Sequence, residues 1–535
     1  MEAANLEDST VVTTDSQSAS PRLAILLAMA MFVFVIDTSL MNVSISAVVR
    51  DLDTTVSGVQ AAVAIEALVS AAFILIGSKV GDLFGRKRAY MTGLALYALG
   101  ALAMVVGQGL AAIIVFWAVI GGLGASLYLP AMQSLIHGNF EGKAQAKAYA
   151  LVGASAAIAA AIGPLLGGFL TTLLSWRVGF MLEAAIIAVV LVGSRRLVRD
   201  VPYTGPRSVD GVGAVLSVVG MGGVVLGVLV WQEGGESVAA LIGLGVAALA
   251  GLFYWLRKRK SEGKPALIDP SLFSSKLFSY GIAQGILQQI ALGGMLIALP
   301  IYLQLVLGYN ALEAGLSLAP LSLTMFGVAL LAGRRAGRRR PAALIRAGFL
   351  LLSVATLLLI PLVPGADSGW TLAIPLVIAG AGLGLLVSQL NNYTLSPVSE
   401  ERVGEAAGVN SATGSFGLSF GLAFAGAIML ATLSIAFTEK SDASNVLPAA
   451  DKQRVAEVLE DDAQVMSDAQ LTELLAEQPE EIQDEIISIN DDARDLSLQI
   501  ALLITLLAAL LGLFNSLKMM RLPDPQQSSA GAAAL

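Results

Sequence analysis

The chain has 535 residues, of which 56% are hydrophobic and 13% are charged, and its formal net charge is -8. Soluble globular proteins average about 25% charged residues, so this chain cannot cover itself with polar surface, and it is too apolar to be disordered. It has no cysteine and a single histidine, His137. We therefore expect no disulfide, no thiol catalysis and no cysteine or multi-histidine metal site, and the acidic total argues against a nucleic-acid partner.

Fourteen apolar runs follow one another along the chain, most of them near or above the roughly 20 residues that cross a bilayer core of about 30 Å. They show no alternation of period two, which favours helices over a transmembrane β-barrel. The sequence therefore predicts an all-α integral membrane protein. The predicted spans are 23–49, 56–76, 90–106, 110–136, 148–174, 178–197, 212–230, 238–256, 277–307, 311–331, 342–362, 370–390, 406–437 and 496–517.

Lys and Arg are distributed unevenly over the short connections between these spans. Of these residues 26 fall on one side, and two, Arg50 and Arg177, fall on the other. Positive charge marks cytoplasmic loops. We expect a multi-pass protein of a bacterial cytoplasmic (inner) membrane with both termini in the cytoplasm.

The first two spans each contain one acid, Asp37 and Glu66. A carboxylate at mid-bilayer costs about 2.5–3.5 kcal/mol, so each acid needs a reason. Asn42 and Ser70 extend polar strips beside them, and we expect Asn42 and Glu66 to line a substrate cavity. Removal from water disfavours the charged form of a carboxyl group, so either acid could load a proton from outside and release it inside. For Asp37 the alternative is a structural hydrogen bond between helices.

The connection after the second span reads GSKVGDLFGRKR and covers residues 77–88. Gly81 and Gly85 permit a tight turn. Asp82 and Arg86 stand four residues apart, close enough to pair or to cap neighbouring helix ends. The alternative is a topology signal made only of positive charge, but that leaves Asp82 and the glycines unexplained.

Span five has a face of small residues on which another helix can approach closely. Pro164 removes the backbone hydrogen bond to Ala160 and should kink the helix. Close packing together with a kink suits a seam that rocks, and a static small-residue interface is the alternative. The residues of this motif are Gly163, Pro164, Gly167 and Gly168.

Span six contains one acid, Glu183, six residues after Arg177. We expect these two residues to form an ion pair at the membrane interface. A functional role for Glu183 is the less favoured alternative.

Spans nine and beyond supply uncharged polar residues rather than acids. Gln284 and Gln288 are one turn apart, Gln289 stands beside them, and Tyr302 follows near the end of the same span. They could form the facing wall of the substrate cavity, where uncharged polar groups suit broad acceptance. The alternative is that the glutamines join neighbouring helices.

The last connection, residues 436–495, is strongly acidic, with 17 acids and 4 bases. By parity it faces outward. Within 452–475 apolar residues recur at loosely helical spacing, which predicts short amphipathic helices at the outer surface. The segment is either a solvated cap or a vestibule that concentrates cations or docks a partner.

A second basic turn, GRRAGRRR at 333–340, follows the first by 256 residues. Two six-helix halves joined by an extra helix pair place these turns equivalently, and parallel repeats around a central site are a common transporter design. The predicted division is an acidic tail at 1–21, an N-terminal bundle at 22–200, a linker with two helices at 201–276, a C-terminal bundle at 277–517 that contains 436–495, and a tail at 518–535.

The motifs now carry a family resemblance. Residues 77–88 resemble the cytoplasmic loop signature of the major facilitator superfamily, and residues 159–168 resemble the motif of its antiporters. Residues 37–43, 175–177, 300–308 and 313–315 resemble the fourteen-helix drug/proton antiporter group. The resemblance implies the major facilitator fold, and it makes the loop of Asp82 and Arg86 a latch that closes the two halves on the cytoplasmic side.

Two features depart from the family pattern. The position of Glu66 is more often aromatic, so an acid there points to a subgroup with its own coupling or substrate. The fourth span usually carries an arginine before its glycine-rich stretch, but none lies between Phe116 and Gly122. The usual arginine-assisted proton relay is therefore in doubt.

The favoured function is a secondary transporter rather than an enzyme. We expect it to export small amphipathic, cationic or zwitterionic compounds in exchange for protons, as a monomer in the lipid bilayer, with no cofactor and no metal. No nucleotide-binding loop is present, which argues against ATP as the energy source. The alternatives are an exporter or flippase of a lipid or secondary metabolite, and a receptor or scaffold that no longer transports.

Overall fold

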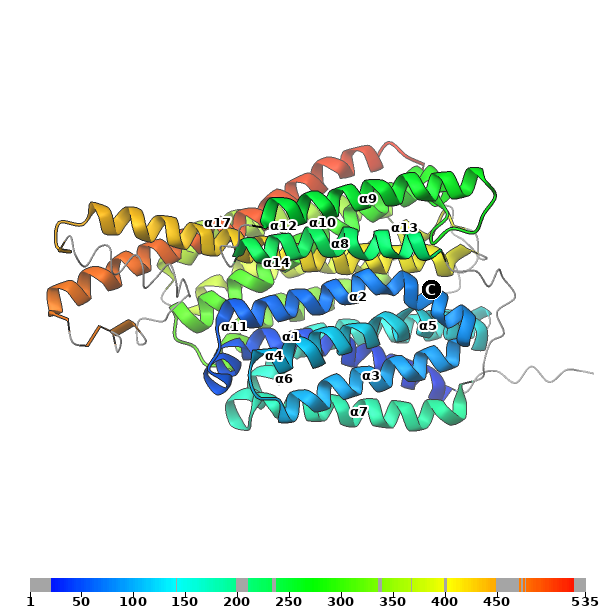
Figure 1. Cartoon of the computed structure of the whole chain (residues 1–535), viewed down its shortest axis with the longest axis horizontal. Coiled ribbons are helices and arrows are strands. Elements are labelled where there is room, and N and C mark those ends of the chain that lie inside the picture. Colours follow the sequence, from blue (N-terminus) through cyan, green and yellow to red (C-terminus); the bar gives the residue numbers. More distant parts are fainter. Residues whose placement is uncertain are drawn as a thin grey trace, which may run out of the picture.

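The computed structural model describes residues 21–140, 142–198, 210–232, 237–334, 339–366, 368–398, 402–448, 471–472, 475–476 and 478–523. Within these residues the regular secondary structure is helical, without strands, and fourteen helices are long and apolar enough to cross a membrane. The predicted all-α class and the number of spans are confirmed. The helices lie nearly parallel to one long axis (Figure 1).

The first six spans form one group of packed helices. The fourth span is interrupted by a π-helical segment, η1. The elements are α1 (Pro21–Leu52), α2 (Val56–Phe84), α3 (Arg86–Val106), α4 (Leu110–Ala112), η1 (Ile113–Gly121), α5 (Gly122–Asn139), α6 (Gly142–Leu173) and α7 (Trp176–Leu197). Helix α3 packs on η1 and α5 of the fourth span and on α7, while α1 packs on α6 and α7.

Two helices, α8 (Gly211–Gln232) and α9 (Val238–Ser261), follow the first group and pack on one another. The remaining spans form the second group, in which α10 packs on α14 and α17, and α13 packs on α11 and α12. Its elements are η2 (Pro270–Ser274), α10 (Lys276–Ile301), η3 (Tyr302–Val306), α11 (Ala311–Arg334), α12 (Pro341–Leu362), η4 (Val363–Gly365), η5 (Gly369–Leu372), α13 (Ala373–Leu395), α14 (Val403–Ala443) and α17 (Glu480–Met519).

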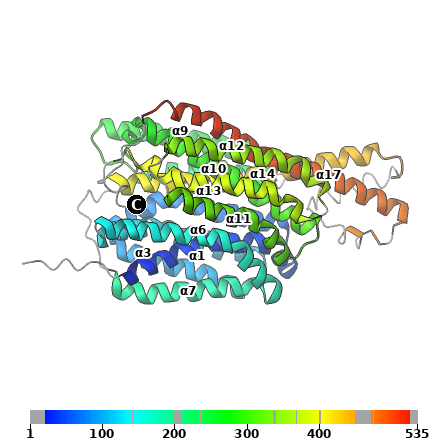
Figure 2. The ribbon, with the colours of Figure 1, turned by 180° about the vertical axis from the view of Figure 1, so that it is seen from behind.

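The two groups meet along two seams, where α2 packs on α14 and α6 packs on α11. Figure 2 shows α6 and α11 side by side. The linker helix α8 contacts both α2 and α14, and its Trp231 ring lies 6.3 Å from that of Phe424 in α14. The additional helix pair therefore covers the α2–α14 seam and does not cover the α6–α11 seam.

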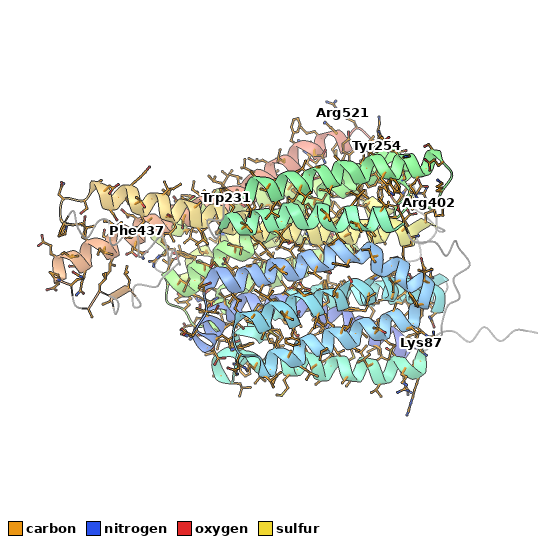
Figure 3. All side chains as sticks on the ribbon, in the orientation of Figure 1. Lys87, Trp231, Tyr254, Arg402, Phe437 and Arg521 are labelled. Carbon is orange, nitrogen blue, oxygen red and sulfur yellow. The ribbon has the colours of Figure 1, made fainter. Side chains whose placement is uncertain are left out.

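The ends of the molecule differ in charge. Lys87, Arg402 and Arg521 lie at one end, which we call the basic end, and Phe437 lies toward the other, the acidic end (Figure 3). At the acidic end α14 and α17 project beyond the other helices (Figure 1). Of the second basic turn of the sequence, at 333–340, residues 335–338 lie outside the described residues.

The acidic segment differs from the prediction where it is described. Its two ends continue the long helices α14 and α17, so the last helix begins at Glu480, whereas the predicted span begins at 496. Contacts between these ends explain the extension: Lys440 pairs with Asp492 at 2.7 Å, and Ser444 donates to Glu485 at 2.6 Å. Most of the predicted amphipathic stretch 452–475 lies outside the described residues.

Candidate functional site

Asp37 occupies the middle of α1, and its carboxylate is 1% exposed. Tyr97 of α3 donates its hydroxyl to Asp37 Oδ2. Trp117 of η1 donates its indole N–H to the same carboxylate, with Nε1 3.0 Å from each oxygen. Two neutral donors from two other helices therefore hold this acid.

The π-helical segment η1 brings Trp117 to this position. A π-helix widens the turn by one residue and appears frequently at functional sites. Trp117 sits at the centre of the nine residues of η1, and its ring also packs edge-on against Phe180 of α7 at 6.2 Å. This donor lies in the stretch where the sequence lacks the expected arginine.

Glu183 of α7 lies in the same cluster, which corrects the predicted pair with Arg177. It is 1% exposed and interacts with the carboxyl groups of Asp37 and Glu66. Arg177 instead pairs with Asp51. The reason is depth, because Glu183 stands about two turns, or about 10 Å, inside the start of α7, whereas Arg177 remains in the first turn.

Glu66 of α2 is the third member of the carboxyl cluster, which we define as Asp37, Glu66 and Glu183. It is 5% exposed and interacts electrostatically with Asp37. Its Oε1 has no hydrogen-bond partner among the described residues. The fully buried Tyr128 ring also interacts with Glu66 and packs edge-on against Tyr97 at 5.6 Å.

No Lys or Arg of the described chain forms a hydrogen bond or an ion pair with the carboxyl cluster. Burying an isolated carboxylate is very costly unless it is paired or takes up a proton, and like charges that share a site raise that cost further. The arrangement therefore suits groups that bind protons or an incoming cation. Sequence reasoning found Asp37 and Glu66, but it assigned Glu183 to the interface and missed Tyr97, Trp117 and Tyr128.

The loop between α2 and α3 has the predicted ion pair. Arg86 Nη2 lies 3.2 Å from Asp82 Oδ1, and Gly85 has a φ of 102°, which favours glycine. Gly81 belongs to α2 and does not form the turn, so that part of the prediction is wrong. Gly77 instead allows α2 to pack closely on α5, because a Cβ there would lie 2.1 Å from Ser126 O of α5.

The basic end of α14 is tied to the linker by a polar network. Asp269 accepts hydrogen bonds from Ser271 N at 2.8 Å and Lys260 Nζ at 2.9 Å, and it pairs with Arg402 at 3.1 Å. Partial burial alone would raise the pKa of Asp269, but these hydrogen bonds and the positive charge of Arg402 lower it to about 2. The Asp269 backbone N–H also donates to Glu405 at 2.5 Å.

The small residues of α6 fit close to two neighbours. A Cβ at Gly163 would lie 2.5 Å from Ser39 Cβ, and one at Gly167 would lie 2.7 Å from Val43 Cγ2, both in α1. A Cβ at Gly168 would lie 2.3 Å from the carbonyl oxygen of Ala311 in α11. The predicted close packing is present, and α6 remains one helix through Pro164.

The seam between α6 and α11 is tight toward the acidic end and loose toward the basic end. A Cβ at Gly315 would lie 2.3 Å from Pro164 O, and Thr172 donates to Asn310 at 3.4 Å. Gly153 lies on nearly the same side of α6 as Pro164, three turns toward the basic end. It is exposed, and a Cβ there would meet no atom within 4 Å.

The α2–α14 seam stays in contact over the corresponding three turns. Ser419 donates its hydroxyl to Ala64 O at 2.6 Å. Eleven residues away on each helix, a Cβ at Gly408 would lie 3.8 Å from Leu75 Cδ2, which is ordinary van der Waals contact. At this depth α6 therefore has open space beside Gly153, whereas α2 and α14 remain in contact.

Comparison with known proteins agrees with this architecture. The family model described as Major Facilitator Superfamily matches residues 27–422. The chain belongs to the major facilitator superfamily. It is a multi-pass membrane transporter and not an enzyme.

Its relatives include proteins named for drug resistance and for transport. The chain is 28% identical over 409 residues to multidrug resistance protein Stp of Mycobacterium tuberculosis, covering 76% of this chain and 75% of that protein. It is 26% identical over 416 residues to a probable actinorhodin transporter of Streptomyces coelicolor, covering 76% and 72%. A bacterial homologue of the human lysosomal transporter Spinster, solved inward-facing and unoccupied, shares the fold with a TM-score of 0.61 at 14% identity, covering 94% and 97%.

The predicted cavity residues of this major facilitator chain have other contacts. Gln284 is fully buried, and its Nε2 donates to Gly512 O of α17 at 3.0 Å. Tyr302 is buried and donates to Ala366 O at 2.8 Å. For these two residues the contacts favour the alternative, that polar groups join helices within the second group.

Three other predicted cavity residues, Asn42, Gln288 and Gln289, lie near the carboxyl cluster or near the α2–α14 seam. Asn42 is buried one turn beyond Asp37 and donates to Thr38 O of its own helix at 2.7 Å. Gln288 is mostly buried and lies 3.5 Å from the half-buried Gln289, measured from Nε2 to Oε1. Gln289 packs against Gly417 of α14, so it stands beside the helix that forms the α2 seam.

Proposed function

We propose that this chain is a proton-coupled antiporter that exports small amphipathic cations or zwitterions by alternating access. The carboxyl cluster is the observation that carries the proposal. It holds three acids, keeps them from water, and gives Asp37 two neutral donors instead of a resident cation. A proton and a cationic substrate are the two kinds of ligand that such a site would exchange.

The neutral donors shape how the exchange works. Trp117 supplies only an N–H, so it stabilises the ionised form of Asp37 without neutralising its charge. When Asp37 is ionised, a cation entering the site meets an uncompensated negative charge. When the cluster is protonated, that attraction is lost, and the cation is released.

The two seams support alternating access. The groups touch tightly toward the acidic end, at Gly315 and Pro164, and leave Gly153 exposed toward the basic end. A central site would therefore communicate with the basic end in this conformation. The unequal distribution of Lys and Arg makes the basic end the cytoplasmic one, with both termini there. The functional unit is a monomer of two six-helix bundles with α8 and α9 between them.

The test uses the full chain in proteoliposomes that contain a pH-sensitive dye, with ethidium as the probe substrate. An ethidium gradient should drive protons in the opposite direction. Asp37→Asn and Glu66→Gln should each reduce this exchange by at least about tenfold, because loss of one charge–charge or charge-assisted interaction costs about 1.5–3 kcal/mol. Glu262→Gln, an exposed acid of the α9 end, is the matched control and should leave exchange unchanged.

Normal coupled exchange in both cluster variants would show that the carboxyl cluster does not couple protons. If the unmodified chain moves ethidium without moving protons, transport is uncoupled and the proposed antiport is wrong. Measurement of Glu183→Gln beside them tests whether the third acid belongs to the same unit.

A further inference from the structure

A groove of about 630 Å³ runs along the outer surface where α1 meets α7. Its walls are apolar and come from both helices. Ile25 of α1 is 51% exposed, and Val189 and Val192 of α7 are 56% and 66% exposed. Because these helices cross the membrane, the groove faces lipid and not the interior of the bundle.

Small residues and close packing make the floor of the groove. A Cβ at Gly193 would lie 2.6 Å from Leu26 Cδ1, so α1 and α7 touch directly beneath the opening. Ala188 lines the groove one turn further from the basic end. An aliphatic chain lying there would bury apolar surface on two helices at once.

Two arginines stand at the basic end of the groove. Arg22 lines it and precedes Ile25 and Leu26 by three and four residues, which places all three on one face of α1. Arg196 is exposed and follows Val192 by four residues, on the groove face of α7. Arg196 is not itself a lining residue, but helix periodicity places it beside the end of the groove that Arg22 lines, on the opposite helix.

We propose that this groove is a binding site for one anionic phospholipid. The acyl chain lies along Ile25, Val189 and Val192, and the phosphate sits between Arg22 and Arg196. Cationic residues just beyond the hydrocarbon attract anionic headgroups, with about a fivefold gain in affinity for each Lys or Arg. The site requires neither the carboxyl cluster nor any transport activity.

Native mass spectrometry of the full chain, released from nanodiscs of phosphatidylglycerol and phosphatidylcholine, tests the assignment. The unmodified chain should retain one phosphatidylglycerol in preference to phosphatidylcholine. The double variant Arg22→Gln/Arg196→Gln should lower that preference by about thirtyfold, from two cations at about fivefold each. Arg257→Gln, which removes an exposed cation from the last turns of α9, is the control and should change nothing.

A second variant separates the groove from simple surface charge. Ala188→Trp fills the groove and should displace the retained lipid, whereas Ala247→Trp on the exposed face of α9 should not. Retention of phosphatidylglycerol in Ala188→Trp would show that only the headgroup binds, and it would overturn the groove site. Equal retention of phosphatidylcholine, or an unchanged preference in the arginine double variant, would overturn the anionic assignment.

Discussion

The two seams between the helix groups differ over the same three turns. At the α2–α14 seam, contact continues from Ser419 and Ala64 to Gly408 and Leu75. At the α6–α11 seam, Pro164 and Gly315 touch, but a Cβ at Gly153 would meet no atom within 4 Å. At this depth the packing is therefore looser at the seam that α8 does not brace.

The strongest test of this difference is to lock the α6–α11 seam at its tight end. The chain has no native cysteine, so Thr172→Cys with Asn310→Cys introduces a unique pair. Cross-linking these positions should reduce ethidium transport at least about tenfold, because the acidic end could no longer open. Transport should return when the cross-link is reduced, and each single cysteine variant should transport normally.

Cross-linking yields at the basic end sharpen the same comparison. Leu75→Cys with Gly408→Cys should cross-link readily in the absence of substrate. Gly153→Cys with Phe326→Cys, at the matching depth of the other seam, should cross-link about tenfold less. Equal yields would mean that both seams separate, or both remain closed, and the asymmetry would be wrong.

A smaller effect is expected when one side chain is added to each seam. Gly168→Ala forces a methyl group against Ala311 O, and overpacking of this kind costs about 1–3 kcal/mol. Transport should fall about tenfold, and the temperature of thermal unfolding should fall with it. Gly408→Ala is the matched control, since a Cβ fits there at 3.8 Å, and it should behave as the unmodified chain.

Removing a single hydrogen bond should weaken the α2–α14 seam only slightly. Ser419→Ala removes the donor to Ala64 O, and such bonds between membrane helices contribute about 0.6 kcal/mol on average. Thermal unfolding in nanodiscs should detect a small loss of stability. Ser388→Ala, which removes a bond to Leu385 O within α13, should have less effect, and a larger loss there would remove the special role of the seam.

The smallest expected effect is on thermal stability and its dependence on pH, at the Asp269 network that ties α14 to the linker. The pKa of Asp269 is about 2, below its ordinary value of 3.8, so its ionised form stabilises the fold above pH 3.8 and loses that effect as the pH falls toward 2. Asp269 is 40% exposed, so water screens the pair and the contribution stays below about 1 kcal/mol. Asp269→Asn should lower thermal stability equally at pH 5 and pH 8, and a difference between them would contradict the assignment.

Much of the fold was predictable because its cause is local. Length and hydropathy define each span, and the structure has all fourteen. The exception is α17, whose first sixteen residues are too polar to be read as a span. They become helical through contacts with α14, such as Lys440 with Asp492, and a scan for apolar runs cannot detect a contact 52 residues away.

The candidate site was predictable only in part, because it depends on where side chains point. An acid within an apolar span is visible in the sequence, so Asp37 and Glu66 were found. The position of Glu183, two turns beyond Trp176, could have predicted that this acid lies in the interior and not at the interface. The contact of Trp117 with Asp37 depends on the π-helical register of η1, and the contact of Gln284 with α17 depends on tertiary packing.

The long helix α14 also has a mechanical consequence. It is unbroken from Val403 to Ala443, a rod of about 60 Å, and Ser419 touches the other half of the molecule along its length. If that contact acts as a fulcrum, the arm toward the acidic end is about 36 Å long and the arm toward the basic end about 24 Å. Tilting the rod would move its projecting tip about one and a half times as far as its basic end, in the opposite direction.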